Sequence, residues 1–226
     1  MIIDLEQEVR RYRLSLRHAL HVGAHHGEED ALYRRLGIEP IYVEANPEAF
    51  AVLRQALPDR ECHPVAIADR EGIADFHVTS FDQSSSLLPL KKHLKIYPGI
   101  VERCLIQVPC TTIDALLGPR RNQIDLINMD IQGAELLALR GASQTLPHVK
   151  CLVTEVNRAE LYEGCGLMHD LDNALRPFGF RRVRSSFPYH RSWGDAFYVH
   201  RRYLRQETWW GKVWGLFDHR ARWRAA

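Results

Sequence analysis

The sequence has no apolar run approaching the roughly 20 residues that a membrane-spanning helix needs. Its first residues carry acids and lack the apolar core of a signal peptide, so we expect a cytoplasmic protein. Cysteine is scarce as well: the five cysteines are scattered without a Cys-x-x-Cys pair, which favours free thiols over a disulfide framework. Internal repeats and low-complexity tracts are also lacking, which excludes solenoid and fibrous architectures.

A large net charge is missing too, because 30 basic residues are balanced by 28 acidic ones and the formal net charge is +2. We therefore expect no bulk binding of nucleic acid. The positive charge that exists is concentrated in residues 201–226, with six arginines and one lysine against two acids. This tail is also rich in tryptophan. Residues 203–224 are therefore expected either to contact an anionic membrane surface peripherally, or to pack on the domain or on a second subunit in a homo-oligomer.

The length of 226 residues fits one α/β domain, and the sequence pattern divides into three parts. Residues 1–17 have apolar side chains at helical spacing, which predicts an N-terminal helix. Between residues 18 and 200, short apolar runs alternate with helical segments, which predicts a largely parallel, doubly wound α/β sheet. Within this part, residues 62–67 are expected to form a single third strand. The basic tail, residues 201–226, is the third part.

Two features depart from simple alternation of strands and helices. Residues 73–79 and 105–108 are extended segments that can pair as an antiparallel β-hairpin arm, with residues 81–102 inserted between them. Such a long insertion is either an ordinary surface loop or a lid over a ligand site. Near the end of the domain, residues 179–183 and 196–200 are separated too briefly for a crossover helix, so we expect the last strand to run antiparallel.

The best-defined candidate site is a glycine loop, His21-Val-Gly-Ala-His-His-Gly27, which joins an apolar run to a helix-forming segment. Glycine allows close approach of the backbone to a ligand and positive φ, and amides at the start of a helix favour negative charge. Glu44, about 20 residues further on, can accept hydrogen bonds from two ribose hydroxyls. The Gly-x-x-x-Gly spacing differs from the Gly-x-Gly-x-x-Gly of dinucleotide sites, so the pattern favours S-adenosylmethionine (SAM) over NAD.

Polar residues follow four of the predicted strands where each strand ends: His21, Glu44, Asp130 and Glu155. Ligands of open α/β sheets bind at the carboxyl ends of the strands. A single acid at such a position is often only a helix cap. The recurrence of polar groups at the ends of four strands in one alternating pattern therefore predicts a ligand site.

Several motifs resemble, in order, those of the FkbM family of SAM-dependent methyltransferases, over roughly residues 18–200. The motifs are His21-Val-Gly-Ala-His-His-Gly27, Tyr42-Val-Glu-Ala-Asn-Pro47, Ala66-Ile-Ala-Asp69, Ser84-Ser-Ser86, Thr111-Thr-Ile-Asp114, Ile127-Asn-Met-Asp-Ile-Gln-Gly-Ala-Glu135, Leu139-Arg-Gly-Ala142 and Val153-Thr-Glu155. The resemblance implies a seven-stranded, Rossmann-like sheet of the class I methyltransferase type. It also implies O-methylation of a hydroxyl on a saccharide, a glycan precursor or a secondary metabolite.

The resemblance implies roles for individual residues. Those expected to line or hold the cofactor are His21, Gly23, Ala24, Gly27, Glu44, Ala66, Asp69 and Asp130. Asp130, and after it Glu155, are the preferred candidates for removing the proton of the acceptor hydroxyl. Ser85, Glu135 and His190 are expected to contact the small-molecule or glycan acceptor, whose pocket the loops 81–103 and 184–195 would complete. Two residues of the glycine loop depart from the family pattern, because His21 replaces an Asp and His25 replaces an Asn. Gln132 also replaces a common acid near Asp130.

Other classes of function stay open on the sequence alone. A non-catalytic module would keep the nucleoside pocket and dock to a membrane or partner through its tail, and the two departures, His21 and His25, motivate this alternative. An NAD-dependent oxidoreductase is disfavoured by the glycine spacing and by the expected antiparallel last strand. The histidines between His18 and His26 lie on a strand end and a loop rather than on one helical face, so we predict no metal site.

Overall fold

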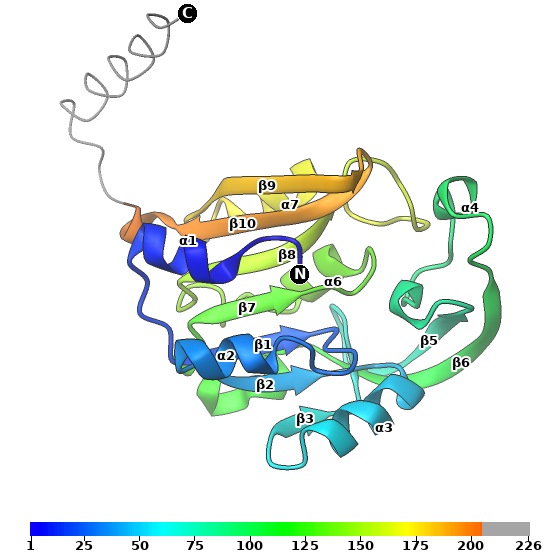
Figure 1. The fold of residues 1–226 in the computed structure, drawn as a ribbon, viewed down its shortest axis with the longest axis horizontal. Coiled ribbons are helices and arrows are strands. Elements are labelled where there is room, and N and C mark those ends of the chain that lie inside the picture. Colours follow the sequence, from blue (N-terminus) through cyan, green and yellow to red (C-terminus); the bar gives the residue numbers. More distant parts are fainter. Residues whose placement is uncertain (205–226) are drawn as a thin grey trace, which may run out of the picture.

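The fold is organised around a seven-stranded sheet with the strand order β3-β2-β1-β7-β8-β10-β9 (Figure 1). A computed structural model describes residues 1–204. The strands of this sheet are β1 (His18–Val22), β2 (Glu39–Val43), β3 (Glu61–His63), β7 (Leu126–Met129), β8 (Cys151–Asn157), β9 (Phe180–His190) and β10 (Trp193–His200). The first five are mutually parallel, whereas β10 runs antiparallel to both β8 and β9. The predicted doubly wound sheet with an antiparallel last strand is confirmed.

Helices cover both faces of this sheet. One face carries α1 (Leu5–Tyr12), α2 (Asp30–Leu36) and α3 (Pro47–Ala56), and the other carries α5 (Ile113–Leu117), α6 (Glu135–Arg140) and α7 (Met168–Leu175). The strands supply both cores because successive side chains point to opposite faces. In β7, for example, Leu126 packs in the core of α1, α2 and α3, and Ile127 in the core of α5, α6 and α7.

A second, three-stranded sheet forms the arm. It consists of β4 (Ala66–Ile67), β6 (Glu102–Thr111) and β5 (Gly72–Thr79) in the order β4-β6-β5, and β5 pairs antiparallel with β6. This confirms the predicted hairpin arm. The insertion between β5 and β6 contains the short helices η1 (Asp82–Ser84) and α4 (His93–Ile96). In Figure 1 the arm stands opposite the ends of β1, β2 and β7.

The prediction of one continuous third strand over residues 62–67 is wrong. Pro64 separates two short strands that belong to different sheets, with β3 beside β2 and β4 beside β6. Proline has no amide hydrogen for a strand ladder, so the chain leaves the main sheet at this point. The change of sheet directs the next residues, Ala66 and Ile67, towards the ends of the neighbouring strands.

Two short helices complete the description, η2 (Gly118–Gln123) and η3 (Arg201–Tyr203). All five cysteines are free, as predicted. Among the described residues, no helix is long and apolar enough to cross a membrane. The predicted contact of residues 203–224 with a membrane or a second subunit falls almost entirely outside the described residues, and it stays a prediction.

Candidate active site

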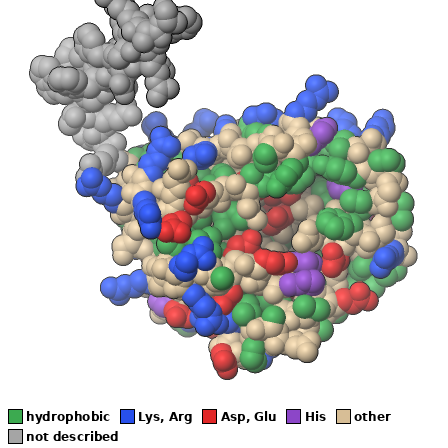
Figure 2. Space-filling model, in the orientation of Figure 1, with side chains coloured by type: hydrophobic (Ala, Val, Ile, Leu, Met, Phe, Trp, Pro, Cys, Tyr) green, Lys and Arg blue, Asp and Glu red, His purple; other side chains and the backbone are tan. Residues whose placement is uncertain are grey.

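A cavity of about 820 Å³ lies between the carboxyl ends of the central strands and the insertion of the arm. This volume is in the range of small-molecule sites. Its wall contains the four strand-end residues His21, Glu44, Asp130 and Glu155, together with Gly23. Figure 2 shows acidic and histidine side chains gathered around a hollow in this face of the molecule. The structure therefore brings the predicted strand-end residues together in one cavity.

The glycine loop is tied to both neighbouring strands. The amides of Gly23 and Ala24 donate to the carbonyl of Val43 at the end of β2, at 2.9 and 3.1 Å. Gly23 has a φ of +78°, and a Cβ there would overlap the carbonyl oxygen of Asp130 and lie 2.8 Å from its carbonyl carbon. Only glycine allows this approach of the loop to the end of β7. The same position leaves the loop backbone open to the cavity.

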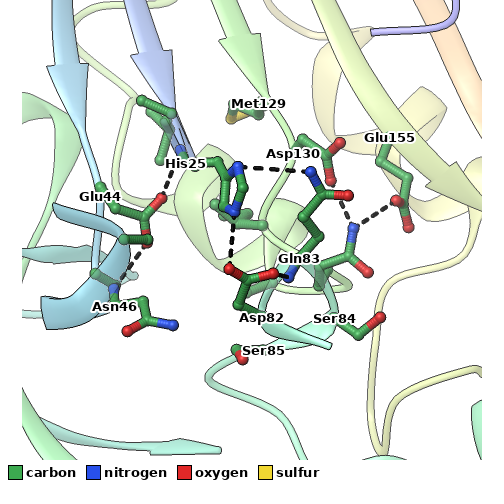
Figure 3. A pocket seen from close by; sticks show the side chains of 18 of the residues that line it. His25, Glu44, Asn46, Asp82, Gln83, Ser84, Ser85, Met129, Asp130 and Glu155 are labelled. Carbon is green, nitrogen blue, oxygen red and sulfur yellow. Dashed lines mark hydrogen bonds and ion pairs between the residues drawn. The ribbon is translucent and has the colours of Figure 1, made fainter. Parts of the chain in front are cut away.

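Glu44 is held in place by two backbone donors. Its Oε2 accepts the amide hydrogen of His25 at 2.8 Å, and its Oε1 accepts that of Asn46 at 2.7 Å (Figure 3). Burial raises the pKa of Glu44, and these two hydrogen bonds oppose the rise. A carboxylate has about four acceptor positions, so further donors from a ligand can still be accommodated.

Asp130 and Glu155 are joined by one side-chain amide. Gln132 Nε2 donates to Asp130 Oδ1 at 2.6 Å and to Glu155 Oε2 at 2.8 Å, and Gln132 Oε1 accepts from Tyr162 at 2.6 Å. Burial, followed by the charges of Asp130 and its neighbouring acids, raises the pKa of Glu155 well above its ordinary value. Asp130 is exposed, and its Oδ2 has no hydrogen bond from the described chain. The two acids therefore differ in environment although one amide bridges them.

His21 lies in the cavity wall as predicted, but it is held in a buried network. The side chain is 3% exposed, and burial lowers the pKa of the imidazole, which favours the neutral ring. Its Nδ1 lies 3.4 Å from the hydroxyl of Tyr33, and its Nε2 lies 3.2 Å from the amide nitrogen of Asn128. A neutral ring at this position contributes no charge to the site.

Two of the predicted site residues, Gly27 and Glu135, lie behind the cavity wall and not in it. A Cβ at Gly27 would come within 2.6 Å of Leu57 Cδ1, so this glycine permits helix packing. The buried Oε1 of Glu135 accepts the amide hydrogens of Ile131 and Gly133 at 3.1 and 3.2 Å. Burial raises the pKa of this carboxyl to about 7. Glu135 therefore orders the loop that follows Asp130, and the structure does not place it against an acceptor.

Asp69 and His190 are also absent from the cavity wall. Asp69 lies in an exposed turn, 3.8 Å from the guanidinium of Arg70, whereas Ala66 lines the cavity as predicted. His190 ends β9, and its Nδ1 accepts the amide hydrogen of Ser192 at 3.2 Å within a turn. The remaining acceptor candidate, Ser85, does lie in the wall, where its hydroxyl accepts the amide hydrogen of Thr79 at 3.0 Å.

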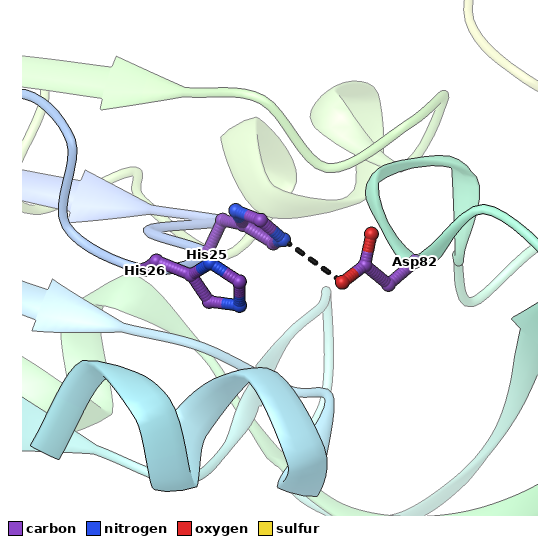
Figure 4. A group of neighbouring side chains, drawn as sticks. All are labelled: His25, His26 and Asp82. Carbon is purple, nitrogen blue, oxygen red and sulfur yellow. Dashed lines mark hydrogen bonds and ion pairs between the residues drawn. The ribbon is translucent and has the colours of Figure 1, made fainter. Parts of the chain in front are cut away.

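The insertion is linked to the glycine loop through His25. The ring's Nδ1 lies 2.7 Å from Glu28 Oε1. Its Nε2 lies 3.1 Å from Asp82 Oδ2, as Figure 4 shows. Burial lowers the pKa of His25, but the two carboxylates outweigh it, and the net pKa is raised. His25, whose protonated form the two carboxylates favour, therefore bridges the loop after β1 and the helix η1 of the insertion. Residues of the insertion line the cavity, as the lid alternative requires.

The group formed by His25, His26 and Asp82 has ligand atoms within 4.8 Å of one another, close enough to be considered for a metal ion. Two observations argue against this use. The two rings are stacked, with centroids 3.6 Å apart and 24° between their planes, so their in-plane lone pairs do not converge. Both ring nitrogens of His25 also lie at hydrogen-bonding distance from carboxylates. The cluster is better described as a link between the loop and the insertion.

Further wall residues come from the two loops, 81–103 and 184–195, that were expected to complete the acceptor pocket. Trp193 Nε1 donates to the hydroxyl of Tyr97 at 3.0 Å, and Tyr189 stacks on Trp193 with centroids 5.9 Å apart. His93 is 4% exposed, and its Nδ1 has no partner in the described chain. Asp195 is the residue that a pattern could have revealed, because it is a lone acid in an otherwise apolar strand.

Residues 21–182 match the methyltransferase FkbM domain, and the chain therefore belongs to the FkbM methyltransferase family. The match confirms the predicted methyltransferase domain and disfavours the oxidoreductase alternative. Over 132 residues it is 34% identical to the 2-O-methyltransferase NoeI of Sinorhizobium fredii. That alignment covers 54% of either chain, so this protein spans about half the length of the curated relative.

Two solved structures of methyltransferases have a loosely similar arrangement. Magnesium protoporphyrin IX methyltransferase from Synechocystis PCC 6803 is 10% identical, with a TM-score of 0.48 over 86% of this chain and 77% of that one. A TehB-like SAM-dependent methyltransferase from Corynebacterium glutamicum is 10% identical, with a TM-score of 0.43 over 86% and 85%. These likenesses are loose, and the Rossmann-like fold follows from the strand order of the chain itself.

Proposed function

We propose that this methyltransferase transfers the methyl group of SAM to a hydroxyl oxygen of a saccharide or glycan precursor. The observation that carries the proposal is the placement of Glu44 and Asp130 in one cavity, at the ends of strands on either side of β1. Glu44, which is suited to hydrogen-bond ribose hydroxyls, and Asp130, which is suited to accept a proton, thus flank the glycine loop. The name of the relative, a 2-O-methyltransferase, also supports an oxygen acceptor.

The cavity fits the cofactor on its own features. Gly23 leaves room where any side chain would overlap the backbone of Asp130, so the loop can lie directly against a ligand. Beside Glu44, the wall is apolar, with Ala66, Ile67 and Phe76, which suits the flat adenine base. We assign the ribose hydroxyls to Glu44 and the methionine part to the backbone of Gly23 and Ala24. The bound cofactor supplies an electrophilic methyl group on a sulfonium.

Asp130 is the proposed base. Gln132 holds one of its oxygens, and the other, Oδ2, is free to accept the proton of the acceptor hydroxyl as the new oxygen–carbon bond forms. A positioned base of this kind typically contributes about 10²–10⁴-fold in rate. Glu155 is assigned a different role, because burial favours its neutral form. It would then hold Gln132, and through it Asp130, in the orientation that the transfer needs.

The acceptor side of the cavity supports a saccharide. Trp193, Tyr97 and Tyr189 provide aromatic surface that can pack against the apolar face of a sugar ring. Burial lowers the pKa of His93, so its imidazole is mainly neutral and can either donate to or accept from a hydroxyl. Aromatic surface combined with a few uncharged polar groups suits a neutral polyol better than a charged acceptor.

A binding measurement and a turnover measurement test these assignments together. In calorimetric titration, Glu44→Ala should weaken SAM binding at least about tenfold, because a charged acceptor of two hydroxyls is lost. Asp130→Asn should change SAM affinity by no more than a few-fold. The kcat for formation of a methylated sugar should fall at least about 100-fold in this variant. Release of S-adenosylhomocysteine in the presence of a panel of free sugars and methyl glycosides gives the turnover.

Glu155→Gln is the matched control, because it makes the same acid-to-amide change on the other side of Gln132. It should retain most of the activity, since an amide resembles the neutral carboxyl that burial favours. Full activity of Asp130→Asn together with an inactive Glu155→Gln would show that Glu155 is the base and that Asp130 only holds Gln132. Turnover of simple alcohols but of none of the sugars would contradict the saccharide assignment.

A further inference from the structure

Two carboxylates in the cavity wall have no task in the transfer described above. Glu29 lies directly before α2, and Asp195 lies on β10, far away in the chain. Both are placed around the same point, because the amino group of Met1 lies 3.1 Å from Glu29 Oε1. Burial lowers the pKa of this amino group, yet the charges of Glu29, Asp195 and Asp130 outweigh it, and the net pKa is raised. The amino group of Met1 therefore occupies Glu29 Oε1, and a cationic ligand group would share this acidic end of the cavity with it.

Each of the two acids keeps an oxygen that no described donor uses. Asp195 accepts the amide hydrogens of Ile2 and Ile3, and both bonds go to Oδ2, which leaves Oδ1 without a partner. The Oε2 of Glu29 has only His21 Nε2 near it, at 4.0 Å, beyond hydrogen-bonding distance. Asp195 is only 5% exposed, so solvent screens its charge poorly. Two carboxylate oxygens thus remain available to a cationic ligand group.

The strand that leads into the glycine loop, β1, cannot itself supply a negative charge to pair with the ammonium of a ligand. Its last polar residue is His21, which burial favours in the neutral form, and its ring nitrogens face Tyr33 and Asn128. A ligand that lies along the loop and carries an ammonium must therefore find its counter-charge on neighbouring elements. Glu29 and Asp195 line the cavity with His21, and they are the acids in a position to provide it.

We propose that Glu29 and Asp195 bind the ammonium of the cofactor's methionine half, with Asp130 adding to the negative potential. The inference rests on the proposed placement of the cofactor in this cavity, with its ribose at Glu44. It assigns the recognition of the amino-acid half to one residue directly before α2 and one on β10, outside the loop that carries the glycines. The two acids hold the cofactor in place and take no part in the proton transfer.

The proposal separates ligands that have the ammonium from those that lack it. SAM and S-adenosylhomocysteine both carry the amino-acid half, whereas 5′-methylthioadenosine keeps the adenosine and the sulfur without it. Charge-assisted hydrogen bonds are among the stronger contacts to a ligand. Removing one of the two acids should therefore cost affinity for the first two ligands and leave the third nearly unaffected.

The test is calorimetric titration of the full chain at pH 8 with SAM, S-adenosylhomocysteine and 5′-methylthioadenosine. Glu29→Gln and Asp195→Asn should each weaken the first two ligands about tenfold or more, while 5′-methylthioadenosine changes less than about twofold. Glu48→Gln, which removes an acid of α3 outside the cavity wall, is the matched control and should leave all three affinities unchanged. Thermal melting of each variant checks that the fold is kept.

Glu29→Gln carries the test if Asp195→Asn fails to fold, because Glu29 accepts no hydrogen bond from the backbones of Ile2 and Ile3. Unchanged SAM affinity in Glu29→Gln, or an equal loss for SAM and 5′-methylthioadenosine, would overturn the proposal. Glu44→Ala distinguishes this failure from a failure of the proposed function, since it should weaken all three ligands. If Glu44→Ala weakens none of them, the placement of the ribose is wrong, whatever Glu29 does.

Discussion

Replacing Gly23 by alanine should separate the glycine loop from the end of β7. The added Cβ would overlap the carbonyl oxygen of Asp130 and lie 3.0 Å from a methyl group of Ile131. The overlapping atom belongs to the backbone directly after β7, which is paired on both sides, so it cannot turn away as a side chain can. The loop must therefore move, and both the cofactor contacts and the position of Asp130 move with it.

The size of the effect follows from two terms. Gly23 has a φ of +78°, and this left-handed conformation costs a residue with a side chain about 1–2 kcal/mol. Forcing an additional methyl group into a packed site costs about 1–3 kcal/mol more. Gly37 is the matched control: its φ is +66°, but a Cβ there would meet nothing within 4 Å. Gly37→Ala carries the first term only.

The assay is thermal unfolding of both variants, followed by SAM titration. For a domain of this size, the packing term corresponds to a melting temperature about 2–12 °C lower for Gly23→Ala than for Gly37→Ala. SAM affinity should fall at least about tenfold in Gly23→Ala, because the backbone that faces the cofactor is displaced. Gly37→Ala should bind SAM as the unmodified protein does. Equal melting temperatures and equal SAM affinities in the two variants would refute the argument from close approach.

Two further predictions concern side chains of β10 that line the cavity, Asp195 and Trp193. Burial and the charge of Asp130 raise the pKa of Asp195 to about 6, so this carboxyl loses its charge as the pH falls through that value. SAM should therefore bind more weakly at pH 5 than at pH 8 in calorimetric titrations, and Asp195→Asn should flatten this dependence of SAM affinity on pH. A pH dependence that is unchanged by the substitution would exclude Asp195 as the titrating group. Trp193→Ala should raise the KM for a sugar acceptor roughly tenfold, because stacking surface is lost, with an unchanged Kd for SAM; an equal loss of SAM affinity would place Trp193 at the cofactor instead.

The central part of the site could be predicted because strand ends are a local property of the chain. An apolar run followed by glycine or an acid indicates where a strand stops, and parallel strands end at the same edge of a sheet. Gly23, Glu44, Asp130 and Glu155 were found in this way, and they all line one cavity.

The same reasoning failed where position in a motif did not decide the direction of a side chain. Glu135 lies in the most specific motif, yet its carboxyl points inward to the amides of its own loop. Gly27 serves helix packing, and the side chains of Asp69 and His190 belong to turns. Each lies within a few residues of a true wall residue, but backbone hydrogen bonds and packing orient it elsewhere.

The sequence by itself determined the fold class, the residues at the strand ends and the family. These features depend on the periodicity of apolar residues and on short motifs. Only the tertiary structure decided how the far end of the cavity is built. Glu29 and Asp195 are separated by most of the chain, and Tyr97 and Trp193 by 96 residues. These residues meet because the last strand inserts beside β8 while the arm folds back over the strand ends. Contacts of this kind arise from packing between distant segments, which local patterns do not encode.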